Sequence, residues 1–384
     1  MSSISFFFPS RKIGGVEVMY ARIAGKLIEE NQCVEICDFS DGIMKQLMSD
    51  YNGRYKLTIY EEGKKLSSQS EVCITSLLFL PSAKLIFPKE LKLLFWDDHP
   101  YNLILFLGHL RLIKEFNHSI FLLYSKLFRK KRYSICRFNL IKALSKNGVV
   151  FMCNYNFHLN KRYFRFNDEP RYLPIPISDK RRFQKDINFK QINCSYLGRL
   201  DSDKAILCIE LMEDVISYNL NNSDCSLKLH IIGNGDKYDL IKEKALLYPD
   251  YFVLCGIIKG DVLDEYFKNT IDLSFAVGTS ALESAGMGIP TLFMRSTSSS
   301  KRLKYNYIWV FDNESYNLSI NESIIKNGLE VKQLVDVVNE LKMCYSSISE
   351  KCYLYVHNNH SLDSVVKLVK GYLASTVLTV EDLI

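Results

Sequence analysis

The sequence predicts an α/β protein of two domains, each built around a parallel β-sheet. The chain has 384 residues, which is enough for two domains of about 150–200 residues that each bury a core. Short apolar runs alternate with amphipathic stretches along most of the sequence, as in parallel sheets with helical crossovers. Near the middle, RYLPIPISDKRR (171–182) places two prolines in a short extended stretch, as an interdomain linker does.

The N-terminal half begins with a strand, a glycine turn and a helix. ISFFFP (4–9) predicts a buried strand, SRKIGG (10–15) a turn, and the apolar spacing over 16–31 a helix. CVEICDF (33–39) is the next expected strand, which completes one unit of a parallel sheet. Further strands are expected at 72–80, 91–96 and 148–154.

A second series of strands and helices follows the linker. The expected strands are 192–198, 227–233, 252–256, 271–277 and 290–294, and the expected helices are 205–219, 237–247, 261–268, a helix around Glu283, 328–350 and 361–375. Because strands and helices alternate again, the second domain is expected to repeat the architecture of the first.

Composition and cysteine usage predict a soluble cytoplasmic protein. Apolar residues make up 47% of the chain and charged residues 24%, as in ordinary globular proteins. The eleven cysteines form no CxxC pair, which favours a reducing compartment over a disulfide framework or a zinc site. The N-terminus does not resemble a secretory signal. The longest charge-free stretch, 147–160, is shorter than the roughly 20 residues of a membrane span.

Basic residues are concentrated in one part of the sequence. Between residues 109 and 182 there are 17 Lys or Arg and four acidic residues, and region 111–137 mixes basic, aromatic and aliphatic side chains. One interpretation is a solvated helical face with long cationic side chains. Another is docking on an anionic membrane surface, where each basic residue contributes on the order of 1 kcal/mol. Nucleic acid is not expected as a partner, because no recognised motif supports it.

Glycines stand where predicted strands end, which is where open parallel sheets bind ligands. Gly14 and Gly15 open the first helix, and Gly233 and Gly235 close the strand at 227–233. Without a Cβ atom, a glycine lets a phosphate or sugar approach the backbone, although it also serves in a plain tight turn. LCGIIKGD (254–261), which includes Ile257, ends another strand, and a flat base is expected to lie against it.

Two stretches of the second half carry charged residues suited to a nucleotide sugar. YLGRLDSDK (196–204) places Arg199 and Lys204 after a strand, where two cations can hold a diphosphate or merely flank an exposed turn. GTSALESAGMGIP (278–290) has Glu283 as the only charged residue between Asp272 and Arg295. We expect this carboxylate to accept hydrogen bonds from a ribose diol rather than only to complement the helix dipole.

The residues before Glu283 are expected to hold phosphate. Gly278, Thr279 and Ser280 offer hydroxyls and free backbone N–H groups at a helix start. In the triplet Asp201-Ser202-Asp203, two acids lie next to the cations, between Arg199 and Lys204 in the sequence. We interpret the triplet as turn chemistry, so no metal site is expected.

Five motifs in order resemble the GT-B nucleotide-sugar glycosyltransferases, most closely the family 4 type. They are GGVE, GRLDSDK, IIGNGD, CGIIKGDVLDEYF and GTSALESAGMGIPTLF. The resemblance implies two Rossmann-like parallel-sheet domains facing across a cleft: an acceptor-binding domain over 1–172, a donor-binding domain over 173–358, and a helix over 359–384 that returns to the first domain. It also implies that Arg199 and Lys204 bind the diphosphate, Glu283 the ribose, and Gly15 faces the phosphates.

One position departs from that family. Phe275 stands eight residues before Glu283, where family 4 enzymes usually have an acid that contacts the donor sugar. The GxSALE form also resembles inverting GT-B enzymes of cell-wall synthesis, so both retention and inversion stay open. Inversion needs a base for the acceptor proton. LLFWDDHPYN (93–102) offers His99 and Asp98 as catalytic candidates ahead of Asp97, although these residues also suit the turn before Pro100.

The expected activity is transfer of a sugar from a nucleotide-diphosphate sugar, of UDP or GDP type, to a saccharide or lipid-linked acceptor. Bacterial surface polysaccharide (O-antigen, capsule or lipopolysaccharide) is the expected product, made without a cofactor at the inner face of the membrane. Two alternatives remain at this point: a sugar-nucleotide epimerase of the same fold, and a non-catalytic nucleotide-sugar-binding protein.

Overall fold

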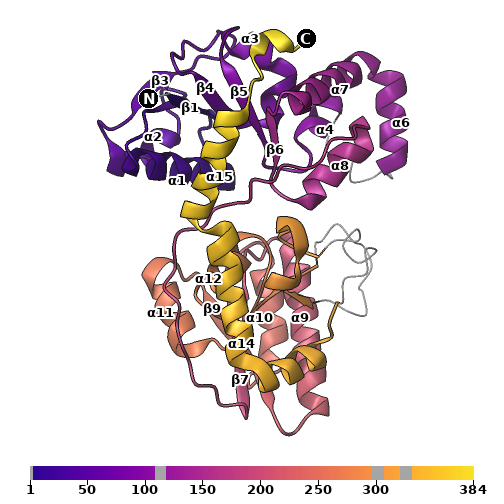
Figure 1. Ribbon diagram of the computed structural model, residues 1–384. Coiled ribbons are helices and arrows are strands. Elements are labelled where there is room, and N and C mark those ends of the chain that lie inside the picture. Colours follow the sequence, from indigo (N-terminus) through magenta and orange to yellow (C-terminus); the bar gives the residue numbers. More distant parts are fainter. Residues whose placement is uncertain (1–2, 109–117, 296–306, 321–330) are drawn as a thin grey trace. The chain divides into compact units, whose positions relative to one another are not determined.

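The computed structural model describes residues 3–108, 118–295, 307–320 and 331–384 (Figure 1). The chain divides into two compact units. The N-terminal unit comprises Met1–Pro176 together with Leu362–Ile384, and the C-terminal unit comprises Ile177–Ser361. Each unit has its own sheet and its own core.

The N-terminal unit is built on a six-stranded, fully parallel sheet in the order β3-β2-β1-β4-β5-β6. The strands are β1 (Ile4–Phe7), β2 (Val34–Asp38), β3 (Lys56–Ile59), β4 (Val72–Ser76), β5 (Lys92–Asp97) and β6 (Val149–Phe151). The helices are α1 (Gly15–Glu29), α2 (Met44–Leu47), α3 (Ala83–Ile86), α4 (Asn102–Leu107), α6 (His118–Phe128), α7 (Lys130–Ser145), α8 (Asn154–Phe164) and α15 (Leu362–Ser375). The strand order reverses between β1 and β4.

Apolar side chains point to both faces of this sheet, so helices cover both. Phe6 belongs to the cluster shared with α1 and α15, whereas its neighbour Phe7 belongs to the cluster shared with α4, α7 and α8. This alternation follows from the two-residue period of a strand. Helix α15 packs on α1, where Lys26 and Asp363 form an ion pair of 2.5 Å.

The C-terminal unit repeats the arrangement in the order β12-β11-β10-β7-β8-β9. Its strands are β7 (Gln191–Leu197), β8 (Ser226–Ile232), β9 (Phe252–Gly256), β10 (Leu273–Ala276), β11 (Thr291–Met294) and β12 (Tyr307–Trp309), of which only β12 pairs antiparallel. Its helices are α9 (Ser202–Asn221), α10 (Tyr238–Leu246), α11 (Gly260–Thr270), α12 (Thr279–Gly286) and α14 (Leu334–His360). The order reverses between β7 and β10.

Several elements differ from the expectations. The expected strand at 72–80 ends at Ser76, because the Ser76 side chain accepts from the backbone N–H of Leu78 and starts a 3-10 helix over Leu77–Ser82. The expected helix at 328–350 runs instead from Leu334 to His360, and residues 328–330 lie outside the described residues. Strands β3 and β12 were not expected.

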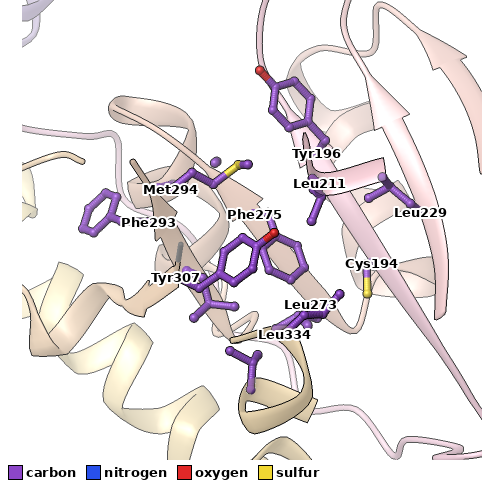
Figure 2. Close-up of a cluster of buried hydrophobic side chains, with 14 of the residues drawn as sticks. Cys194, Tyr196, Leu211, Leu229, Leu273, Phe275, Phe293, Met294, Tyr307 and Leu334 are labelled. Atoms are coloured by element: carbon purple, nitrogen blue, oxygen red, sulfur yellow. The ribbon is translucent and has the colours of Figure 1, made fainter. Parts of the chain in front are cut away.

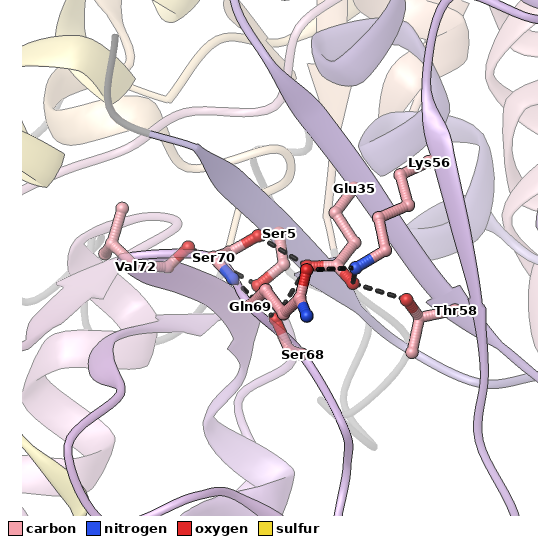
Figure 3. A network of polar contacts seen from close by, with 8 residues as sticks. All are labelled: Ser5, Glu35, Lys56, Thr58, Ser68, Gln69, Ser70 and Val72. Atoms are coloured by element: carbon pink, nitrogen blue, oxygen red, sulfur yellow. Dashed lines mark hydrogen bonds and ion pairs between the residues drawn. The ribbon is translucent and has the colours of Figure 1, made fainter.

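A buried carboxylate ties strands β2 and β3 of the N-terminal sheet to the loop that precedes β4 (Figure 3). Glu35 of β2 accepts hydrogen bonds from Thr58, Ser68 (2.7 Å) and Ser70 (2.6 Å) and pairs with Lys56 at 3.4 Å. Burial raises the pKa of Glu35, but the three hydroxyl donors and the lysine outweigh it, so the pKa lies below its usual value. The network stabilises the fold and is not a candidate catalytic or binding site, because the protein's own donors already satisfy the Glu35 carboxylate.

Candidate functional site

The strand order places the charged residues expected to bind the donor, Arg199, Lys204 and Glu283, after the ends of two neighbouring strands of the C-terminal unit. Leu197, the last residue of β7, is in register with Ala276, the last residue of β10. The loop carrying Arg199 and the loop carrying Gly278 therefore leave the same edge of the sheet side by side. This is the point where the strand order reverses, and open α/β sheets bind ligands in the crevice at such a point.

Two cations follow β7 at this edge. Arg199 is exposed and forms an ion pair with Asp201 at 3.0 Å. Lys204 lies in the first turn of α9, and its amine has no hydrogen bond or ion pair within the described part of the chain. Burial lowers the pKa of Lys204, and the nearby positive charge of Arg199 lowers it further. An anion between the two cations would relieve this repulsion.

The start of α12 offers unpaired donors beside these cations. Gly278 caps the helix with φ of 69°, a conformation that favours glycine, and the space around a Cβ there is open. The backbone N–H groups of Thr279 and Ser280 have no acceptor within the described residues. A helix start with free N–H groups favours an anionic ligand.

Glu283 lies one turn into α12 and is half-buried. Its carboxylate has no hydrogen bond or ion pair within the described residues. Its neighbours Leu282 and Ser284 are buried against the core. Packing therefore holds α12 in place, while the Glu283 carboxylate makes no interaction with the described protein residues. A half-buried carboxylate without a partner is suited to accept hydrogen bonds from a ligand diol.

The structure gives the glycines after β8 a packing role. A Cβ on Gly233 would collide with the carbonyl oxygen of Gly198, and a Cβ on Gly235 would collide with the backbone of Leu200 and Asp201. These two glycines let the loops after β7 and β8 touch: Leu200 N–H donates to Asn234 O at 2.9 Å. Their close packing fixes the position of the loop that carries Arg199 and Lys204.

Ile257, directly after β9, is 62% exposed.

Phe275 is fully buried and cannot face a ligand at the edge of the sheet. Its ring packs edge-on against Tyr307, with 5.0 Å between centroids, inside the core shown in Figure 2. The position at which the family that the sequence resembles usually has an acid therefore belongs to the hydrophobic core of this unit.

In the N-terminal unit, the two glycines that open α1 differ in their surroundings. A Cβ on Gly15 would meet nothing within 4 Å, whereas a Cβ on Gly14 would lie 2.6 Å from the carboxylate of Glu17. Glu17 is buried, yet its side chain has no partner within the described residues. The sequence analysis did not single out Glu17, although it is the acid of the GGVE motif.

Two adjacent aspartates end β5 and have different surroundings. Asp97 is fully buried and accepts from Asn160 at 2.8 Å, while its carbonyl accepts from Asn156 at 2.7 Å. Burial, with the charge of Asp98 second, holds the pKa of Asp97 well above its usual value. Asp97 thus joins β5 to α8 and is a structural residue.

Asp98 has one oxygen held and one free. Its Oδ1 accepts from Asn102 at 2.8 Å and Ser76 at 3.0 Å, while its buried Oδ2 has no hydrogen-bond partner within the described residues. Burial raises the pKa of Asp98 to about 7, with a smaller contribution from Glu17. A carboxylate with this pKa is suited to take up a proton near neutral pH. Sequence reasoning missed Asn102 and Ser76, since isolated polar residues in an apolar stretch carry no spacing signal.

His99 follows on the exposed side of the same turn. The backbone N–H of Tyr101 donates to His99 Nδ1 at 3.2 Å, so the neutral ring carries its proton on Nε2. Desolvation by the surrounding protein lowers the pKa of the ring, although the residue is exposed. His99 is therefore arranged as a hydrogen-bond donor, and Asp98 is the better proton acceptor of the two.

The described residues contain no group of three His, Cys, Asp or Glu side chains that could hold a metal ion. No described helix is both long and apolar enough to cross a membrane.

The sequence matches no protein-family model and no curated relative. Its fold, however, is similar to solved structures. HepE from Anabaena, solved with UDP and glucose, is 11% identical over 98% of this chain and 100% of that chain, with a TM-score of 0.56. The lipopolysaccharide outer core galactosyltransferase WaaB is 12% identical over 97% and 99%, with a TM-score of 0.58. TarM is 11% identical over 98% and 99%, with a TM-score of 0.57. The expected fold is confirmed: the chain has the two-domain α/β fold of the GT-B glycosyltransferases.

Proposed function

We propose that the chain is a glycosyltransferase that moves a sugar from a nucleoside-diphosphate sugar to a saccharide or lipid-linked acceptor. The observation that carries the proposal is the adjacency of two loops at the switch point of the C-terminal unit. One loop brings Arg199 and Lys204, and the other brings the free N–H groups of α12 and the unpartnered Glu283. A pyrophosphate and a ribose are the chemical groups that such a set of side chains fits.

In this proposal each element of the edge binds one part of the donor. Arg199, Lys204 and the start of α12 bind the pyrophosphate, with Thr279 and Ser280 contributing N–H groups and hydroxyls. Glu283 accepts hydrogen bonds from the ribose hydroxyls. The base lies against the stretch after β9 that includes Ile257, and UDP or GDP is the nucleotide. Gly14 and Gly15 are proposed to border the phosphates, which the open space at Gly15 supports.

Transfer requires a bond from the acceptor oxygen to the anomeric carbon to form while the bond from that carbon to the diphosphate breaks. Arg199 and Lys204 stabilise the negative charge that the leaving diphosphate gains. The acceptor hydroxyl loses its proton to Asp98, whose Oδ2 is the oxygen left without a donor. His99, protonated on Nε2, orients the donor sugar or the acceptor by hydrogen bonding. No step of this mechanism uses a metal.

The acceptor and its pathway are part of the same proposal. We infer a hexosyl transfer in the synthesis of a bacterial surface polysaccharide, at the cytoplasmic face of the membrane. The support is the likeness in fold to WaaB, which acts on the outer core of lipopolysaccharide. Exposed apolar and basic residues in the described part of region 111–137 also support it. Residues 111–117 of that region lie outside the described residues.

Nucleotide binding tests the proposal directly. A thermal-shift screen with UDP-, GDP-, CMP- and dTDP-sugars should raise the melting temperature with one nucleotide class. Glu283→Gln should weaken that binding roughly 10- to 150-fold, because a hydrogen bond to a charged acceptor contributes about 1.5–3 kcal/mol. The matched control is Glu243→Gln, an exposed acid of α10 that has no hydrogen bond or ion pair within the described residues, and it should leave the affinity unchanged.

The products of the reaction separate the proposal from its alternatives. Incubation of the bound nucleotide sugar with no acceptor should leave the sugar intact, and adding an acceptor extract should release the free nucleotide. Conversion to an epimeric nucleotide sugar without acceptor would identify an epimerase instead. Binding without turnover under all conditions would identify a non-catalytic binding protein, and the absence of any nucleotide binding would refute all three.

A further inference from the structure

Two partly exposed tyrosines lie next to the turn that follows β5 and have no role in the proposed transfer mechanism. Tyr101 comes two residues after His99, and Tyr155 lies in the first turn of α8, shortly after β6. Asp97, the last residue of β5, is in register with Phe151, the last residue of β6. The segments that carry the two tyrosines therefore leave the same edge of the sheet side by side.

Hydrogen bonds hold the start of α8 against the end of β5. The side chain of Asn156 donates to the carbonyl of Asp97 at 2.7 Å. The hydroxyl of Tyr172 donates to Asn154 Oδ1 at 2.8 Å, one residue before Tyr155. Tyr155 therefore stands on a segment that is fixed on both sides, as a residue that positions a ligand has to be.

The two tyrosines and His99 form one connected group. The side chains of Tyr101 and Tyr155 share a hydrogen bond. The ring centroids of His99 and Tyr101 lie 5.7 Å apart, with the rings inclined at 54°, and the backbone N–H of Tyr101 donates to His99 Nδ1. Burial is the main reason that the pKa of Tyr155 lies above its usual value, so its hydroxyl keeps its proton.

A surface of this composition suits a neutral sugar ring. Two phenols and an imidazole make it up, and desolvation lowers the pKa of His99, which favours the neutral form of the imidazole. Tyrosine rings offer an apolar face, and their hydroxyls both donate and accept hydrogen bonds. A pyranose has the matching features, with C–H groups on a face and hydroxyls around the rim. A phosphate calls for cations instead, and these three residues supply none at neutral pH.

We propose that Tyr101 and Tyr155 bind the terminal pyranose of the acceptor, which is recognised there as a neutral saccharide and not through a phosphate group. This inference rests on the proposed function and names its acceptor class. The sugar packs on the ring of Tyr101, and the hydroxyls of both tyrosines bond to hydroxyls of the sugar rim. This brings the reacting hydroxyl to the turn that carries Asp98. The tyrosines hold the acceptor and take up no proton.

Saturation-transfer NMR with the full-length protein and no nucleotide sugar tests this binding without any transfer reaction. The probes are the methyl glycosides of glucose, galactose and N-acetylglucosamine, with glucose 1-phosphate as the charged comparison. At least one neutral glycoside should receive saturation, chiefly at its ring C–H protons, and glucose 1-phosphate should receive none. Absence of saturation at every neutral glycoside, or stronger saturation of the phosphate, would overturn the inference.

Tyrosine variants locate the binding. Tyr101→Phe keeps the ring and loses one hydroxyl, so it should weaken glycoside binding about 2- to 12-fold. Tyr101→Leu also removes the ring and should weaken binding further, with its melting temperature measured to show that it is folded. The matched control is Tyr55→Phe, a partly buried tyrosine of the same unit that precedes β3 at the opposite edge of the sheet. It should bind like the unmodified protein, and an equal loss in Tyr55→Phe would refute the assignment.

Transfer kinetics separate this inference from the proposed function. Tyr101→Phe and Tyr155→Phe should raise KM for the acceptor while kcat and donor affinity change little, because the lost contacts bind the ground state and the transition state alike. A protein that transfers sugar with an unchanged acceptor KM in both variants would refute the tyrosine site alone. A protein that binds glycosides through these tyrosines but binds no nucleotide would keep the saccharide site and refute the transferase.

Discussion

The carboxylate of Glu17 occupies the place that a side chain on Gly14 would take, because a Cβ on Gly14 would lie 2.6 Å from Glu17 Oε2. The first glycine of the GG pair therefore makes room for a buried acid of the protein itself. Glu17 in turn raises the pKa of Asp98, although burial of Asp98 has the larger effect. This connects the glycine turn after β1 to the proposed proton acceptor after β5.

Displacing or neutralising Glu17 should lower the pKa of Asp98 from about 7. In Gly14→Ala the flexible Glu17 side chain has to swing away, and in Glu17→Gln its charge is lost. Both variants should shift the acidic limb of the kcat/KM profile to lower pH, by up to roughly one unit. Gly371→Ala in α15 of the same unit is the matched control, because a Cβ there also meets nothing within 4 Å and the residue is not placed at the site. An unshifted profile in both variants would show that Glu17 does not act on Asp98.

Replacing Asp98 with Asn should reduce kcat roughly 10²- to 10⁴-fold, the usual contribution of a general base, while donor affinity stays unchanged. In the unmodified protein, activity should fall as the pH drops below about 7, because Asp98 then takes up a proton. Transfer assays from pH 5 to 9 with the two proteins check both points. Full activity in Asp98→Asn would remove this residue from the mechanism.

Asp98 should also make the stability of the protein depend on pH, and in the opposite direction to activity: stability should fall as the pH rises. A carboxyl group whose folded-state pKa is raised binds its proton more tightly in the folded protein. Asp98 therefore makes the folded protein less stable as the pH rises from about 4, its unfolded pKa, to about 7. Urea unfolding at pH 5 and pH 8 should show that Asp98→Asn loses part of this pH dependence. If the unfolding free energy of Asp98→Asn changed between pH 5 and pH 8 as much as that of the unmodified protein, Asp98 would not be the source of the pH dependence.

Adding a methyl group at Gly233 or Gly235 should destabilise the C-terminal unit by at least roughly 2 kcal/mol each, because backbone atoms lie in the way and cannot move independently. Gly260→Ala is the control in the same unit: its Cβ meets nothing within 4 Å, and only its φ of 59° is unfavourable. That change should cost about 1 kcal/mol. Denaturant unfolding checks the comparison, which fails if the three variants are equally stable.

The Glu35 network should contribute to stability above the pKa of an unfolded glutamate and lose that contribution in acid (Figure 3). Its folded-state pKa is lowered, so the ionised form is favoured by folding, and stability falls as the pH drops below about 4. Glu35→Gln should unfold more readily at pH 7 and show a flatter decline between pH 5 and pH 3. Glu71→Gln, an exposed acid of the same unit, should retain the steep decline.

The alternation of strands and helices was readable from the sequence because the central strands are continuous apolar runs. Strand β3 was not predicted because its sequence KLTI lies at the edge of the sheet, is mostly exposed to solvent and forms no continuous apolar run. Strand β12 was not predicted because it has only three residues. The expected strand at 72–80 was too long, since an apolar run does not reveal that Ser76 caps the following turn.

The candidate site was predictable only in part. Residues at strand ends, such as Arg199 and Glu283, follow from motif order, and the sheet topology brings their loops together. The packing role of Gly233 could not be read, because it depends on a neighbouring loop 35 residues earlier in the sequence. Nor could the hydrogen bonds of Asn102 and Asn160 to the aspartates, which depend on tertiary contacts.

The second unit is, in topological terms, an insertion within the first. Residues 362–384 complete the N-terminal unit: Thr376 Oγ1 donates to Leu93 O at 2.9 Å, and Leu93 N–H donates to Leu378 O at 2.9 Å. During synthesis these residues emerge only after the whole C-terminal unit. The N-terminal unit therefore cannot complete its fold until α15 and the residues after it have been made. A fragment ending at Pro176 would lack that helix, whereas Ile177–Ser361 could be excised as one uninterrupted piece.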